Sequence, residues 1–216
     1  MHKPRFRGRI HQVAFYITLA KTLVYIICSI VKQGSPGILI YLISQIVLFG
    51  ISSTYHTTIW KSKKNRQFFQ KLDHISIFIL ISGTQTSVAL TLIPLGKYTK
   101  RMLMTTWTIS LSGILKILLM NNFHTNIDTL VYILHGISVI PFFNIIVKSI
   151  SLCDALLFIL GGAIYIVGGC IYAIEKPNPS PKVFGYHEVF HIMTVLANWC
   201  FFVPLLKRYI TVFLIK

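Results

Sequence analysis

Apolar stretches long enough to cross a lipid bilayer recur along the whole chain. A membrane-spanning α-helix needs about 20 consecutive, mostly apolar residues. Seven such spans are predicted, at approximately 12–31, 37–60, 73–94, 101–120, 128–148, 153–174 and 184–206. In the bilayer core every backbone N–H and C=O has to be bonded internally, so apolar runs of this length predict helices. We therefore expect an all-α polytopic membrane protein whose seven transmembrane helices form one bundle.

Composition supports a membrane protein with a single domain. Only 12% of the residues are charged, against roughly 25% in soluble domains. Seven spans leave no room for a sizeable soluble domain, so residues 1–216 are predicted to form one transmembrane domain. The 4 cysteines are far apart and include no C-x-x-C pair, which argues against disulfides and thiolate metal sites.

The net charge of +16 needs an explanation, because basic proteins often bind nucleic acid. Here Lys and Arg gather in the short joins between apolar runs, as expected for anchors beside anionic lipid. We therefore expect membrane lipids, and not nucleic acid, around this chain. The basic N-terminal segment is expected to lead into an uncleaved first helix and not a cleaved signal peptide, with a mitochondrial address as an open alternative. A slight excess of Lys and Arg in the joins on its side predicts a cytoplasmic N-terminus.

Two histidines at the start of the last span form the strongest chemical motif. His187 and His191 are four apart, so on a helix they share one face. With Glu188 they give H-E-x-x-H, the zinc-protease pattern in which Glu is the general base. Such proteases commonly take a third, downstream ligand, but no Asp, Glu or further His follows His191. This disfavours a protease, and we expect at most a supporting or structural role for Glu188.

Polar groups from three spans are expected to meet on one side of the membrane. Ser52 and His56 lie near the end of the second span, and Asp73 opens the third. Because successive spans alternate in direction, these ends and the start of the seventh span face the same side. A catalytic zinc takes three protein ligands and a water, and His56, His187 and His191 supply three. Asp73 is then predicted to deprotonate the attacking water, and Ser52 to orient a ligand or stabilise an oxyanion.

Other interpretations of these residues are open. A histidine at a helix end is more often an interfacial residue than a metal ligand. Asp73, at a predicted first turn, could be only a charge favoured by the helix dipole. The remaining histidines singled out lack comparable neighbours in the sequence: His2, His11, His124 and His135.

Three sequence blocks can be taken together: Ser52-x-x-x-His56, the segment from Leu72 to Thr84, and the segment from Phe184 to His191. They resemble the signatures of the hemolysin III family, the bacterial branch of the progestin and adiponectin receptor (PAQR) proteins. The blocks have the family's order and spacing, and the resemblance covers nearly the whole chain. One departure is Gln85-Thr86-Ser87, where many members have a proline, and it is expected to alter only helix kinking.

The resemblance implies a seven-helix protein of the bacterial inner membrane with a cytoplasmic N-terminus. It also implies Zn²⁺ near the cytoplasmic face, with His56, His187 and His191 as ligands and Asp73 and Ser52 beside them. Related members are viewed as ceramidase-like lipid amidases, which implies zinc-dependent hydrolysis of a lipid amide or ester. The alternative is a non-enzymatic receptor-like or membrane-lytic protein with a structural zinc, cytolysis being a label attached to some members. A transporter is a third possibility.

Overall fold

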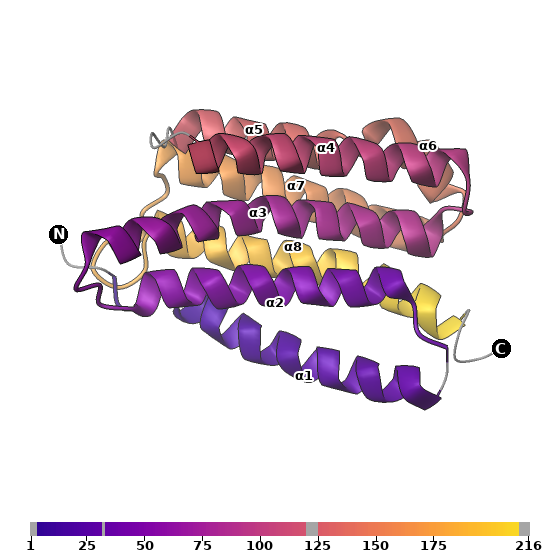
Figure 1. The fold of residues 1–216 in the computed structure, drawn as a ribbon, viewed down its shortest axis with the longest axis horizontal. Helices are drawn as coiled ribbons and strands as arrows, with labels where there is room; N and C mark the ends of the chain where they lie inside the picture. Colours follow the sequence, from indigo (N-terminus) through magenta and orange to yellow (C-terminus); the bar gives the residue numbers. More distant parts are fainter. Residues whose placement is uncertain (1–3, 32, 120–124, 212–216) are drawn as a thin grey trace.

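The computed structural model describes residues 4–31, 33–119 and 125–211 and is a bundle of long helices (Figure 1). α1 and α4 border the bundle on opposite sides in that view, and the two ends of the chain lie at opposite ends of it. The elements in chain order are α1 (Arg9–Val31), α2 (Pro36–Thr57), α3 (Lys63–Leu92), α4 (Lys97–Leu119), α5 (Thr125–Ile137), η1 (Ile140–Phe142), α6 (Phe143–Val147), α7 (Leu152–Ile174) and α8 (Tyr186–Tyr209).

The prediction of seven spans is confirmed, since 7 helical segments of the described chain are long and apolar enough to cross a membrane. The helix that carries the predicted third span, 73–94, starts well before it. α3 begins at Lys63, where the Ser62 hydroxyl caps it by accepting from the backbone N–H of Asn65 at 3.4 Å. Such a cap satisfies an N–H that would otherwise lack a partner. Asp73 therefore lies well inside a helix.

Apolar side chains cover the outside of the bundle, while hydroxyl groups lie within it. Ile30 is 81% exposed, whereas Ser82 and Thr106 are 0% exposed. Lipid tails are as apolar as leucine, so an outer face of this kind suits a bilayer, and the small polar side chains inside can bond between helices. The distribution supports an integral membrane protein.

The fifth predicted span is one segment, 127–147, but it is built from three helical pieces, α5, η1 and α6. Pro141 lies in η1 and lacks the N–H that would continue the helix. Gln85 of α3 stabilises the break, because its side-chain amide donates to the carbonyl oxygens of His135 and Gly136 at 2.9 and 3.2 Å. Gln85 thus ties α3 to the end of α5.

Glycines of α7 allow a close approach to α8. A Cβ atom added to Gly161 would lie 3.0 Å from the Cβ of Cys200, and one added to Gly168 would lie 3.2 Å from that of Met193. Both distances are tighter than ordinary van der Waals contact, so only glycine permits this spacing. The close α7–α8 pair sets the position of the first turns of α8, where two of the candidate histidines lie.

Two lysines that lie within membrane-spanning helices have partners in the bundle. Lys116 Nζ lies 2.6 Å from the Asp128 carboxylate. Lys21 Nζ donates to Gln45 Oε1 at 3.2 Å and lies over the ring of Phe202, 4.5 Å from its centroid. A paired or stacked cation costs far less at membrane depth than an isolated one.

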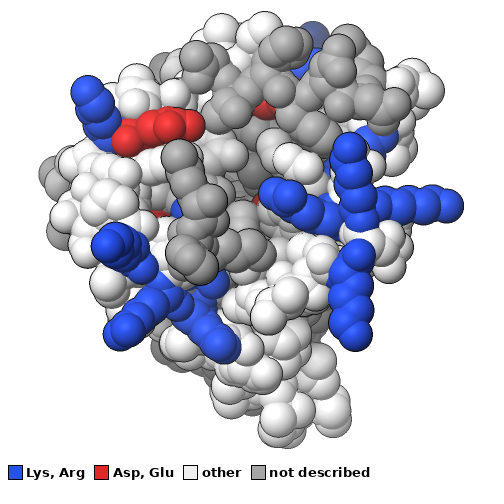
Figure 2. Space-filling model, turned by 90° about the vertical axis from the view of Figure 1, so that its left-hand side faces the viewer, with Lys and Arg blue, Asp and Glu red and all other residues white. Residues whose placement is uncertain are grey.

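Figure 2 shows the end of the bundle at which α1 and α8 begin. Lys and Arg side chains project from both sides of this face, whereas Asp and Glu are scarce on it. Exposed cations in the described joins here include Arg5, Lys61 and Lys182. Cations placed in this way suit contact with anionic headgroups.

Candidate metal centre

Three buried histidines from two helices meet at this end of the bundle. His56 lies in the last turn of α2, and His187 and His191 lie in the first turns of α8. Each offers one ligand atom, and the three atoms all lie within 4.8 Å of one another. The three residues are 7%, 8% and 2% exposed. The structure thus brings together the three residues that the sequence singled out, and the cluster could hold a metal ion.

The spacing of the ring nitrogens fits a tetrahedral ion. The Nε2 atoms of His56 and His187 are 3.1 Å apart. Two imidazole nitrogens at about 2.0–2.1 Å from one zinc ion would be separated by roughly 3.3 Å. Neutral imidazoles are also the donors that zinc takes most readily among the side chains present here. The donor set therefore suits zinc, and the separation of these two nitrogens is close to the tetrahedral value.

Asp73 and Ser52 lie beside the histidine cluster. Asp73 Oδ2 is 3.4 Å from His56 Nε2, and the carboxyl group is only 14% exposed. Ser52, one turn before His56 on α2, is buried and lies close enough to Asp73 to interact with its carboxylate. The alternative in which Asp73 is merely a helix-end charge is contradicted, because α3 begins ten residues earlier, at Lys63.

His74 follows Asp73 but takes a different direction. Its Nδ1 lies 3.3 Å from the hydroxyl of Tyr132 on α5, and the same hydroxyl donates to the His74 carbonyl oxygen at 3.3 Å. Consecutive helical residues point about 100° apart, so α3 presents Asp73 to the histidines of α2 and α8 and His74 to α5.

Glu188 has a structural role in this geometry. Its carboxylate accepts from the backbone N–H of Gly185 at 2.8 Å, which caps α8, and from Arg7 Nε at 2.6 Å. The side chain is fully buried. Both oxygens are therefore engaged away from the histidine cluster, which is the structural role we expected and differs from that of a zinc-protease base. Arg7 was missed by sequence reasoning, since it looked like one of several basic anchors.

His11 was also missed, because nothing near it in the sequence has metal-binding character. The structure stacks its ring on that of His191, with centroids 3.7 Å apart and planes 10° apart. Of the other histidines singled out, His135 on α5 is buried against α3 and α4, and its Nε2 lies within hydrogen-bond distance of Ser82 and Thr106. His2 and His124 fall outside the described residues.

A comparison with known proteins gives the family. The profile of the family described as "Haemolysin-III related" matches residues 1–202. This chain belongs to that family. Among curated proteins, the haemolysin-III-related chain is similar to the "Hemolysin-3 homolog" of Bacillus subtilis strain 168, with 29% identity over 160 residues, 71% of this chain and 73% of the relative. The resemblance inferred from the three sequence blocks is thereby confirmed at the level of the family.

The histidine cluster of the haemolysin-III-related chain opens into a cavity of about 510 Å³. Its polar end includes Ser52, Asp73, His187 and His191, and its remaining wall comes largely from α3, α5 and α7. Apolar side chains dominate that wall, among them Leu80, Ile81, Ile133, Ile137, Phe158 and Ile166. This volume is within the range of ligand-binding cavities in general. The cavity therefore combines a polar, metal-competent end with an apolar body.

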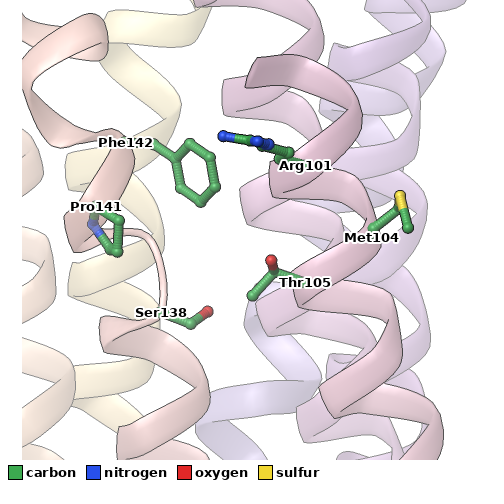
Figure 3. A pocket seen from close by; sticks show the side chains of 6 residues that line it. All are labelled: Arg101, Met104, Thr105, Ser138, Pro141 and Phe142. Atoms are coloured by element: carbon green, nitrogen blue, oxygen red, sulfur yellow. The ribbon is translucent and has the colours of Figure 1, made fainter. Parts of the chain in front are cut away.

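A second hollow of about 390 Å³ lies between α4 and the broken fifth span (Figure 3). Arg101, Thr105 and Ser138 line it together with Pro141 and Phe142. Arg101 is near the start of α4, so this hollow is remote from the histidine cluster along the bundle. It has no group of metal-ligating side chains, and it is not the candidate site.

Proposed function

We propose that this haemolysin-III-related chain is a membrane-embedded, zinc-dependent hydrolase of lipid amides or esters. The observation that supports it best is the junction of a buried histidine cluster with an apolar cavity of about 510 Å³. An acyl chain in the apolar body would bring the adjoining carbonyl group to the polar end. Membrane lipids are accordingly the proposed substrates.

The residues that would hold zinc are His56, His187 and His191. When bound, zinc supplies a water whose pKa is lowered towards about 7 and a Lewis acid for a carbonyl oxygen. The fit rests on the three buried imidazoles and on the 3.1 Å separation of two of their nitrogens.

The other steps fall to Asp73 and Ser52. Asp73, 3.4 Å from His56, accepts the proton of the attacking water and can return it to the leaving group. Ser52 is buried one turn from His56, and its hydroxyl donates to the negative charge that develops on the carbonyl oxygen. Glu188 has no part in the chemistry, because Arg7 and Gly185 occupy its oxygens.

The number of clustered donors favours catalysis over a structural role for the metal. Structural zinc sites almost always have four protein ligands, whereas catalytic sites have three and leave one position open. Among the described residues the cluster has three members. A receptor-like or membrane-lytic protein with a structural zinc remains the alternative, and turnover distinguishes it.

The proposed location is the bacterial inner membrane, with the N-terminus and the metal centre at the cytoplasmic face. The basic end of the bundle in Figure 2 supports this orientation, since the positive-inside rule places Lys and Arg in cytoplasmic joins. Cysteine accessibility at position 61, in the join between α2 and α3, measured in intact cells and inverted vesicles, tests the orientation. Labelling of a cysteine at position 61 from outside intact cells would indicate the opposite orientation.

The function is tested on protein purified in detergent or nanodiscs. We expect about one zinc per chain and zinc-dependent release of fatty acid from an N-acyl amide or an ester lipid. Asp73→Ala should keep its zinc and lose roughly 10²–10⁴-fold in turnover. Asp154→Ala is the matched control, because that carboxylate pairs with Lys207 at 2.9 Å near the start of α7, remote from the site. Bound zinc without turnover of either lipid would favour the structural alternative.

A further inference from the structure

His11 on α1 is a buried imidazole for which the proposed chemistry has no use. It is 2% exposed, and within the described residues neither of its ring nitrogens has a hydrogen-bond partner. Leaving a polar group buried without a partner costs free energy. At a merely structural position, an apolar residue of similar shape would therefore give a more stable protein. The ring lines the cavity and contacts Phe49 on α2 at 5.1 Å between centroids.

The parallel stack on His191 distinguishes His11 from an ordinary core residue. The two ring planes differ by 10° and their centroids are 3.7 Å apart. The other ring pairs in the cluster are tilted or edge-on, such as His56 with His191 at 60°. His11 therefore covers one whole face of the His191 ring.

A ligand role for Nε2 of His191 leaves its Nδ1 as the nitrogen available for an orienting hydrogen bond. A metal-bound imidazole ordinarily donates its second ring N–H to a carboxylate, a carbonyl or water. For the Nδ1 atom of His191 no partner is present among the described residues. The stack is thus the contact that limits rotation of the His191 ring on the side of α1.

The segment before α1 places His11 in register with His191. Arg7 is paired with the buried Glu188 at the start of α8. Gly8 has a φ of +79°, and a Cβ atom added to it would lie 2.7 Å from the Cβ of His56. A larger residue would be strained in this backbone conformation and would push α1 away from α2. Arg7, Gly8 and His11 together join α1 to the two helices that bear the histidine cluster.

We propose that His11 is a positioning residue of the metal centre, which fixes the plane of the His191 ring by stacking in place of a hydrogen bond. The inference rests on the proposed metal centre, but it does not depend on which substrate is hydrolysed. It predicts that the ring face of His11 matters for metal affinity and that its nitrogens do not.

The test compares Co²⁺ binding by the full chain in detergent, followed by the visible absorption of the bound ion and by competition with Zn²⁺. His11→Ala should weaken binding about 10- to 100-fold, as loss of an orienting partner commonly does, and should change the Co²⁺ spectrum. His11→Phe keeps an aromatic face and should bind within threefold of wild type. His135→Ala, a buried histidine on α5 that does not line the cavity, is the matched control and should leave both readouts unchanged.

The possible outcomes distinguish failure of the positioning role from failure of the proposed hydrolase. If His11→Ala binds Co²⁺ as tightly as wild type, the inference is wrong. If His11→Phe is as weak as His11→Ala, the nitrogens act and stacking does not, which also overturns it. Metal binding that follows the predicted order without lipid turnover would remove the proposed hydrolase and leave the positioning role intact. No metal binding by wild type would remove both.

Discussion

The Nε2 atoms of His56 and His187 lie 3.1 Å apart although 131 positions separate the two residues in the sequence. No local pattern brings them together; the pairing depends on how α2 and α8 cross at one end of the bundle. Two imidazoles at this distance either share a proton or share a metal ion. The nearby His191 makes a shared metal the better explanation.

Removal of a single histidine of the cluster should therefore largely abolish zinc binding. We expect His56→Ala and His191→Ala to retain less than about a tenth of the zinc of wild type, because two protein ligands hold zinc far more weakly than three. Metal analysis of the purified proteins measures this, and His135→Ala serves as the control for a buried histidine outside the cluster. Equal zinc in all the variants would disprove the site.

The catalytic role of the Ser52 hydroxyl can be tested by comparison with Ser53, its neighbour on α2. Ser52→Ala should keep its zinc and lose roughly 10²-fold in turnover, the loss expected for one donor to an oxyanion. The Ser53 hydroxyl donates to the Gly50 carbonyl within α2 at 3.0 Å and does not line the cavity. Ser53→Ala should therefore behave as wild type, and similar losses in both variants would show that Ser52 has no special role.

The cavity can be narrowed without disturbing the fold. Gly162 lines it, and a Cβ atom added there would meet nothing within 4 Å. Gly162→Leu should therefore lower turnover of a long-chain substrate at least about tenfold, while a short-chain analogue and the zinc content stay unchanged. Gly96→Leu, outside the cavity and equally uncrowded, is the control. Unchanged turnover of the long-chain substrate would mean that the acyl chain lies elsewhere.

The pair formed by Arg7 and Glu188 should contribute to stability and not to catalysis. Arg7→Ala leaves a fully buried carboxylate without its partner and should lower stability by about 3 kcal/mol. Arg7→Ala with Glu188→Gln should recover part of that loss, because the charge is gone and an amide oxygen can still accept from Gly185. Arg9, whose guanidinium donates to Gln12 at the surface, gives the control Arg9→Ala.

Thermal unfolding in detergent measures these differences. A double variant less stable than Arg7→Ala would show that the charge of Glu188 is favourable even without Arg7. A large loss in Arg9→Ala would show that removal of any nearby cation destabilises this end of the bundle.

Much of this protein follows from its sequence alone. Runs of about 20 apolar residues predict helices wherever lipid is the solvent, because an unbonded peptide group is too costly there. The i, i+4 spacing of His187 and His191 places both on one face of α8, and alternation of the spans brings His56 and Asp73 to the same end. These conclusions need only periodicity and the number of spans.

Other features were decided by the tertiary structure. Whether His11 or His135 faces the histidine cluster depends on the rotation and height of α1 and α5 against their neighbours, which no local pattern specifies. The Arg7–Glu188 pair depends on a chain reversal at Gly8, and the early start of α3 depends on the Ser62 cap overriding a polar run. The wall of the cavity comes largely from α3, α5 and α7, which only the folded bundle brings together. Packing between distant segments, and not local composition, sets these positions.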